Sequence, residues 1–242
     1  MELLKIENMD SMIREKKSNK RQIHPLGLVH PSRIIATGSS GQGKSNFVLN
    51  LLWKGIIPYD RIYMYSKHLS QDKYEFLYNH LLHLQEALKR KGMKKNSIIM
   101  AWEDSLTNLV SNDDLDKKYA NLIVLDDFPL LTKTQQKQIG ELYCSCRHKN
   151  TSIITISQMY FQLPRSLRLN LSYAFIGNNS NKKELSLLSN ELACDISTSQ
   201  FKRLYNLIHE QKFNMLMIDN ETRDPRLKYR KNLDQPVDIM LV

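Results

Sequence analysis

One eight-residue segment limits what this chain can fold into. Residues 38–45 read Gly-Ser-Ser-Gly-Gln-Gly-Lys-Ser and match the pattern G-x-x-x-x-G-K-[ST]. An apolar run with strand character, 34–37, precedes the segment, and a helix-like stretch, 46–53, follows it. The chain has only eight glycines, and three of them lie within residues 38–43. A tight glycine loop between a strand and a helix is therefore the strongest structural expectation.

Such a loop suits phosphate chemistry. Glycines let it turn successive backbone N–H groups inward, and the following helix adds its positive N-terminal end. We expect the phosphates of a nucleotide to be held by Gly38, Ser39, Ser40, Gly41, Gln42, Gly43, Lys44 and Ser45. Lys44 would reach the β- and γ-phosphates, and the Ser45 hydroxyl would bind Mg²⁺. The alternative is an ordinary glycine turn, which the flanking strand and helix disfavour.

Composition narrows the class of protein. The 242 residues are 41% hydrophobic and 25% charged, which is typical of a globular chain and not of a disordered one. No apolar stretch reaches the ~20 residues that span a bilayer, and the charged start is unlike a signal peptide, so we expect a soluble protein that is not secreted. Three cysteines without metal-site spacing are expected to be reduced thiols.

Short apolar runs alternate with amphipathic segments along the chain. Strand-like runs occur at 33–37, 61–65, 97–101, 122–125, 152–156, 173–176 and 213–218. Helical patterns lie between them, with Asp72, Thr134 and Thr198 or Ser199 as candidate N-caps. This alternation predicts an α/β fold with a mostly parallel central sheet and helices on both faces. We expect a basic N-terminal arm at 1–24, one domain at 25–220 and a basic C-terminal extension at 221–242.

A second candidate site follows from the ends of two later strands. The run 121–125 is apolar and ends in Asp126 and Asp127, and the run 152–156 ends in Ser157 and Gln158. In a parallel sheet the carboxyl ends of the strands face the ligand crevice. Asp126 would hold Mg²⁺ there, and Asp127 would orient or deprotonate an attacking water, unless it only caps the turn before Pro129. Gln158 would contact the γ-phosphate or that water, the alternative being an ordinary polar strand end.

Taken together, these motifs resemble a known family. The glycine loop, the acidic strand 122–127, the segment 146–154 and the stretch 157–170 are similar to the DNA-packaging ATPases of large double-stranded DNA viruses, the poxvirus-type branch of the FtsK/HerA superfamily. The resemblance covers roughly residues 30–218. It implies a RecA-like P-loop NTPase core that assembles into a homo-oligomeric ring, pentamer or hexamer. Members commonly have glutamate where Asp127 stands here.

The resemblance also implies a function and partners. It implies hydrolysis of ATP with Mg²⁺ to move double-stranded DNA into a preformed capsid, with viral capsid proteins as partners. The expected location is the host-cell viral assembly site, in the cytoplasm or nucleus, with possible association with the virion. A ring implies an arginine donated across the subunit interface, for which Arg147 is the first choice and Arg165 and Arg168 are alternatives.

The net charge of +10 agrees with a polyanionic partner. Basic residues concentrate at 14–21, 89–95 and 223–231, whereas 103–127 is acidic overall. Such clusters favour contacts to the DNA backbone without base readout, although solvated lysine faces or contacts to a capsid protein remain alternatives. Competing functions are a helicase or transposon-associated P-loop ATPase, a small-molecule kinase, and a non-catalytic DNA-binding adaptor.

Overall fold

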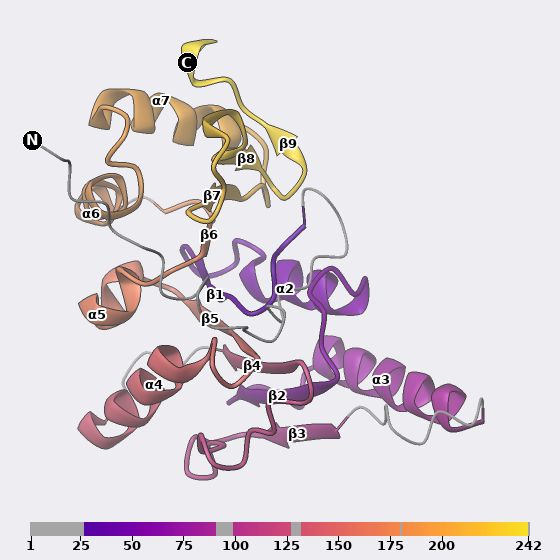
Figure 1. Cartoon of the computed structure of the whole chain (residues 1–242). Helices are drawn as coiled ribbons and strands as arrows, with labels where there is room; N and C mark the ends of the chain where they lie inside the picture. The colour runs from indigo at the N-terminus through magenta and orange to yellow at the C-terminus, as the bar shows by residue number, and fades with distance from the viewer. Residues whose placement is uncertain (1–26, 91–98, 127–131, 180, 242) are drawn as a thin grey trace, which may run out of the picture.

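A single sheet runs through the computed structural model, which describes residues 27–90, 99–126, 132–179 and 181–241 (Figure 1). Within these ranges the sheet has nine strands in the order β3-β2-β4-β5-β1-β6-β7-β8-β9. Their bounds are β1 (Arg33–Thr37), β2 (Arg61–Ser66), β3 (Ile99–Glu103), β4 (Asn121–Asp126), β5 (Thr151–Ser157), β6 (Tyr173–Ile176), β7 (Leu216–Asp219), β8 (Tyr229–Lys231) and β9 (Gln235–Pro236).

The strands from β3 to β6 are all parallel, and β7, β8 and β9 each pair antiparallel with the strand before them. The predicted mostly parallel sheet is therefore confirmed. β5 lies between β1 and β4, so one strand separates the strand before the glycine loop from the acidic strand. The carboxyl ends of β1, β4 and β5 consequently meet at one edge.

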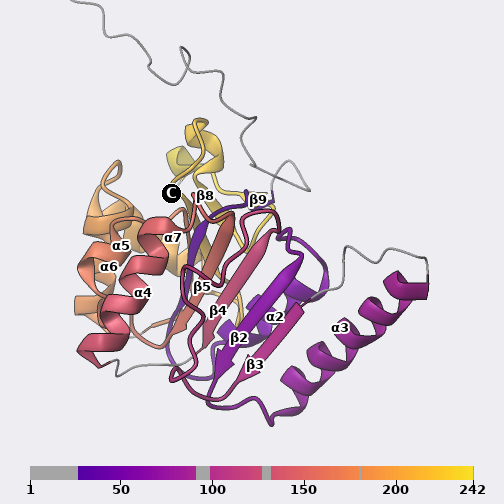
Figure 2. The same ribbon diagram turned by 60° about the horizontal axis from the view of Figure 1, so that its bottom comes forward.

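Helices cover both faces of the sheet, as predicted. Hydrophobic side chains of α2 and α3 pack on one face, and those of α4 to α7 pack on the other (Figures 1 and 2). The bounds are α2 (Lys44–Trp53), α3 (Asp72–Arg90), α4 (Lys133–Ser145), α5 (Arg165–Arg168), α6 (Lys182–Leu192) and α7 (Thr198–Ile208). The central strands alternate between the two layers: Ile34 packs with α2 and α3, and Ile35 with the opposite layer. Unbroken apolar runs such as 122–125 follow from burial on both faces.

Two helices begin slightly earlier than predicted. Thr132, not Thr134, caps α4, and Ser197, not Thr198 or Ser199, caps α7. Each cap forms a reciprocal pair with a glutamine three residues later, Gln135 or Gln200. The capping box satisfies two backbone donors at once. This explains why Thr132 and Ser197, and not the neighbouring hydroxyl residues, are the N-caps.

The predicted boundary at residue 220 does not mark the end of the sheet. The segment expected to be a basic extension contributes β8 and β9 to the sheet. In the pairing of β7 with β8, Leu216 lies opposite Lys231 and Ile218 lies opposite Tyr229. Arg230 is 2% exposed and its guanidinium donates to Asp219 at 2.5 Å. A buried strand was hidden from sequence reasoning because burial of this arginine depends on a carboxylate eleven residues away.

Candidate nucleotide-binding site

The glycine loop has the backbone conformation that its sequence predicts. Gly38, Gly41 and Gly43 have φ of 144°, 74° and 79°, a region that L-residues rarely adopt. At Gly38 a side chain is also excluded by space, because a Cβ there would lie 3.0 Å from the backbone of Gly177. The loop is anchored to the end of β6 by a bond from Ser39 N to Asn178 O of 3.0 Å. Its shape is thus fixed by neighbouring backbone.

Lys44 begins α2 and is directed back over the loop. The ammonium group donates to the carbonyl oxygen of Ser39 at 2.9 Å, and only 8% of the residue is exposed. Gly43 is the N-cap of this helix in a left-handed conformation, without a side-chain cap. The helix N-terminus and the lysine therefore face the same concave loop, the combination that binds phosphate.

A cavity of about 390 Å³ brings the predicted residues together. The glycine loop and the start of α2 contribute Ser40, Gly41, Gly43, Lys44, Ser45 and Asn46 to its lining. The ends of β4 and β5 contribute Asp126, Ile156, Ser157 and Gln158. The segment around the start of α3 contributes His68, Gln71, Lys73 and Tyr74. Residues from four separate parts of the sequence converge here. Gly38, Ser39 and Gln42 belong to the loop without lining the cavity.

Asp126 ends β4 and is 3% exposed. Ser45 lines the same cavity, so a carboxylate and a hydroxyl oxygen are available to a hard cation, and these are donors that Mg²⁺ accepts. Asp127, the predicted water-activating residue, lies outside the described residues. Gln158 directly follows β5, is exposed and lines the cavity.

Tyr74 is a site residue that sequence reasoning missed. It belongs to α3, is 1% exposed, and its hydroxyl donates to Asp126 Oδ2. Burial and the charge of Asp126 raise the pKa of Tyr74 above its ordinary value, while hydrogen bonds with Ser66 and Ser45 oppose the rise. The phenol therefore stays a protonated donor beside the two oxygen groups that Mg²⁺ would use. In the sequence Tyr74 has the same spacing as the core residues Leu77 and Leu81, which concealed it.

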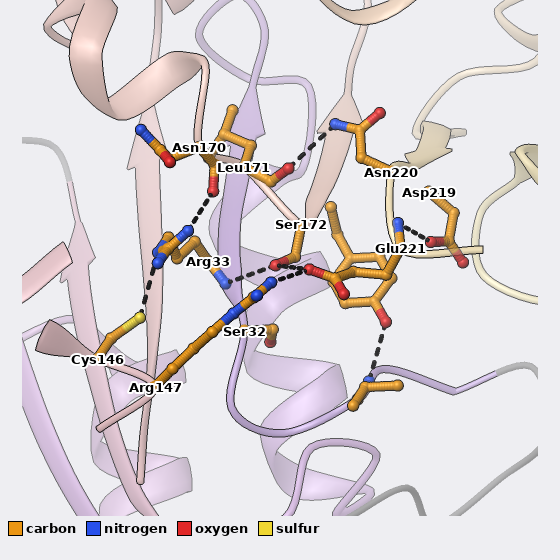
Figure 3. A network of polar contacts seen from close by, with 12 residues as sticks. Ser32, Arg33, Cys146, Arg147, Asn170, Leu171, Ser172, Asp219, Asn220 and Glu221 are labelled. Carbon is orange, nitrogen blue, oxygen red and sulfur yellow. Dashed lines mark hydrogen bonds and ion pairs between the residues drawn. The ribbon is translucent and has the colours of Figure 1, made fainter. Parts of the chain in front are cut away.

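Arg147 lies just before β5 begins, at the end of the parallel strands opposite to the glycine loop. Its guanidinium donates to Glu221 at 2.5 Å, and Glu221 also accepts from Ser172 at 2.9 Å (Figure 3). About half of the arginine side chain, 49%, remains exposed. Within this chain Arg147 is thus part of a local polar network and does not belong to the cavity.

The two alternative arginines differ in their surroundings. Arg168 makes two bonds to Glu191, of 2.8 and 3.0 Å, and donates to the carbonyl oxygens of Phe161 and Leu163. Its side chain is 9% exposed, whereas that of Arg165 is 75% exposed and lies 3.9 Å from Glu191. All four of these contacts hold Arg168 within its own chain, whereas Arg165 is mostly exposed.

The basic clusters are only partly described. Residues 14–21 and 91–95 lie outside the described residues. In the third cluster Arg230 is buried, Lys228 pairs with Asp195, and Arg226 pairs with Asp224 at 2.8 Å. Much of the C-terminal charge is therefore neutralised within the chain. No helix among the described residues is long and apolar enough to cross a membrane.

The fold and the cavity together define a class of protein. A glycine loop joins β1 to α2, β5 separates β1 from the acidic strand β4, and a polar residue ends β5. This is the arrangement of a RecA-like P-loop NTPase.

The comparisons with known proteins place the chain in a particular family. A family model described as Poxvirus A32 protein matches residues 8–223, and the chain belongs to this family. A monkeypox virus relative, DNA packaging protein OPG160, is 25% identical over 146 residues, which cover 59% of this chain and 46% of the relative. The chain thus aligns with about half the length of such curated relatives.

Two solved structures share the fold. B204, the DNA-packaging ATPase from Sulfolobus turreted icosahedral virus, is 14% identical with a TM-score of 0.57, over 86% of this chain and 100% of that chain. The genome packaging NTPase B204 from Sulfolobus turreted icosahedral virus 2, in complex with ATP-gammaS, is also 14% identical, with a TM-score of 0.54 over 86% and 98% of the two chains. At this identity the two structures show the fold alone.

Proposed function

We propose that this protein is a Mg²⁺-dependent ATPase that moves double-stranded DNA into a preformed viral capsid. The observation that carries the proposal is the cavity in which the glycine loop, Asp126 and Gln158 meet. Membership of the poxvirus A32 family supports it, as does the likeness to packaging ATPases, one of which binds ATP-gammaS. A ring, pentameric or hexameric, acting at the viral assembly site in the cytoplasm or nucleus completes the proposal.

The residues divide the chemistry between them. Backbone N–H groups of the loop and the Lys44 ammonium bind the β- and γ-phosphates. Ser45 and Asp126 would hold Mg²⁺, and the ion would supply positive charge beside the phosphates. Asp127 orients the attacking water, and Gln158 donates to the γ-phosphate or to that water. Tyr74 keeps the Asp126 carboxylate in place through its hydroxyl.

ATP turnover, measured with and without long duplex DNA alongside the oligomeric mass, tests the proposal. We expect turnover that rises with DNA and a mass equal to five or six subunits. Lys44→Ala should abolish turnover with the fold retained, whereas Lys54→Ala, at the other end of α2, should leave turnover unchanged. Unchanged hydrolysis in Lys44→Ala would refute the assignment of the loop.

The water-activating residue and the trans-acting arginine need a separate experiment. Asp127→Asn subunits should bind ATP but not hydrolyse it, and Arg147→Ala subunits should lack the contact to their neighbour's γ-phosphate. A mixture should then recover some hydrolysis, because some interfaces combine an intact Asp127 with an intact Arg147. No recovery at any ratio counts against Arg147 and leaves Arg165 as the candidate.

Binding to DNA is expected to depend on backbone charge. Affinity for duplex DNA should fall steeply as salt rises and should vary little with base sequence, because counterion release supplies the binding free energy. Fluorescence anisotropy with two duplexes of unrelated sequence measures both properties. A strong sequence preference would contradict phosphate contact, and efficient strand separation would favour a helicase.

A further inference from the structure

The residues around the cavity determine how a nucleotide would be oriented in it. Asp126 ends β4 and Gln158 directly follows β5, and both strands lie on one side of β1, whereas β6 and β7 lie on its other side (Figure 1). A triphosphate whose γ-phosphate points to Asp126 and Gln158 therefore extends its nucleoside towards the β6 and β7 side. The residues on that side are the ones available to contact the base.

Phe213 occupies that side of the loop. It lies three residues before β7, whose first residue, Leu216, pairs with Ile176 at the carboxyl end of β6. A Cβ placed on Gly43 would be 3.3 Å from Phe213 Cδ1, so the ring lies directly against the glycine that caps α2. Yet 63% of Phe213 is exposed. The aromatic side chain thus borders the phosphate loop and still presents much of its surface to solvent.

The backbone at Phe213 is held in an uncommon conformation. Its φ is 68°, and the other described non-glycine residues with positive φ are Asn150 and Asn232, a residue type that tolerates this region. The turn is fixed on its C-terminal side: Asn214 Nδ2 donates to Ile208 O at 3.1 Å, and Met215 N donates to Asn232 Oδ1 at 3.0 Å. Strain of this kind persists when the surroundings enforce it, and it often positions a functional side chain.

We propose that Phe213 is the stacking platform for the base of the bound nucleotide. This inference rests on the proposed function, because it needs a triphosphate in the glycine loop with its γ-phosphate towards Asp126. Stacking uses the face that every base shares. Loss of the ring should therefore weaken ATP and GTP alike, and it should leave inorganic tripolyphosphate, which has no base, unaffected.

Isothermal titration calorimetry of the full chain with Mg²⁺ and each of ATP, GTP and tripolyphosphate tests the proposal. In Phe213→Ala the affinity for both nucleotides should fall about tenfold, the size expected for a lost base-aromatic stack, and that for tripolyphosphate should change less than about twofold. Phe213→Gly accepts a φ of 68° without strain and should show the same losses, which separates loss of the ring from distortion of the turn.

A matched control comes from α3, where Phe76 is 59% exposed on a groove beside Trp53 and Leu77. Phe76→Ala should keep the affinity for ATP. An unchanged affinity for ATP in Phe213→Ala would overturn the proposal. Equal losses for ATP and tripolyphosphate in both Phe213 variants would overturn it as well. If the wild-type chain binds none of the three ligands, the failure lies in the phosphate-loop assignment and thus in the proposed function.

Discussion

Replacing Arg168 by methionine separates a structural arginine from one that acts across a subunit interface. The guanidinium donates twice to Glu191, at 2.8 and 3.0 Å, and once each to the carbonyl oxygens of Phe161 and Leu163, at 3.0 and 2.9 Å. Side-chain exposure is 9% for the arginine and 11% for the glutamate. Methionine fills a similar volume but leaves the carboxylate and both carbonyl oxygens without these donors.

The expected loss of stability follows from these contacts. Removing one partner of a buried ion pair costs roughly 3–5 kcal/mol, mostly because the remaining charge is desolvated without compensation. Glu191 keeps some contact with solvent, and Arg165 Nε lies 3.9 Å from it, so we expect the lower end, about 3 kcal/mol. A domain with a typical free energy of unfolding, roughly 5–15 kcal/mol, would remain folded. Arg168→Met combined with Glu191→Met should recover about 2 kcal/mol, because the carboxylate that Arg168 paired with is removed as well.

Urea unfolding monitored by circular dichroism measures both free energies. ATP turnover of the same variants, measured well below the unfolding midpoint, shows whether the loss concerns stability or catalysis. A change in the free energy of unfolding of less than about 1 kcal/mol together with abolished turnover would refute a structural role and would mark Arg168 as a residue of the reaction.

Three further outcomes are expected. Tyr74→Phe should lower the free energy of unfolding by about 1–2 kcal/mol, measured in urea, since the buried Asp126 loses a donor; an unchanged value would show that the bond is replaced. Gly38→Ala should lower the free energy of unfolding by more than about 2 kcal/mol, measured in the same way. Gly140→Ala, inside α4 with open space around it, should raise the free energy of unfolding by up to about 1 kcal/mol. Equal effects of the two substitutions would contradict the close contact between Gly38 and Gly177. Burial acts to raise the pKa of Glu191, but its arginine partner lowers it overall, so the pair's stabilisation is complete above the ordinary pKa of 4.5 and is lost as pH falls through the lower folded value. The stability difference between wild type and Glu191→Gln should therefore shrink below about pH 4.5, as unfolding at several pH values measures; a constant difference would exclude this linkage.

Local patterns predicted most of the sheet and the phosphate loop. Strands buried on both faces are apolar without interruption, and the glycines of the loop have an unambiguous backbone requirement. The strand order could not be predicted, because β5 reaches its place between β1 and β4 only through packing of distant segments. Tyr74 was missed for the same reason: its partner Asp126 is 52 residues away, and its spacing on α3 is that of a core residue.

Charge was the least informative signal. Residues 221–242 were interpreted as a basic extension of the domain, yet they include the buried strand β8, whose Arg230 is paired with Asp219. Net charge counts side chains irrespective of their partners, whereas the surface field depends on which of them are neutralised nearby. The remaining excess lies partly in residues 14–21 and 91–95, outside the described residues.

The position of Arg147 constrains how subunits can assemble if it acts in trans. Arg147 precedes β5, whereas the nucleotide cavity is at the carboxyl ends of the strands, and a strand of five residues such as β1 spans about 16 Å. One subunit must then present the surface around the strand starts to the carboxyl edge of the next. Such a contact uses two different surfaces and is heterologous, the kind that closes into a ring. The ion pair between Arg147 and Glu221 must also break. This costs little stability, because the pair is partly exposed and exposed ion pairs contribute little to the free energy of unfolding. Arg165 begins α5 and would require a different interface if it acted in trans. Identifying a trans-acting arginine would therefore also identify the surfaces through which the subunits meet.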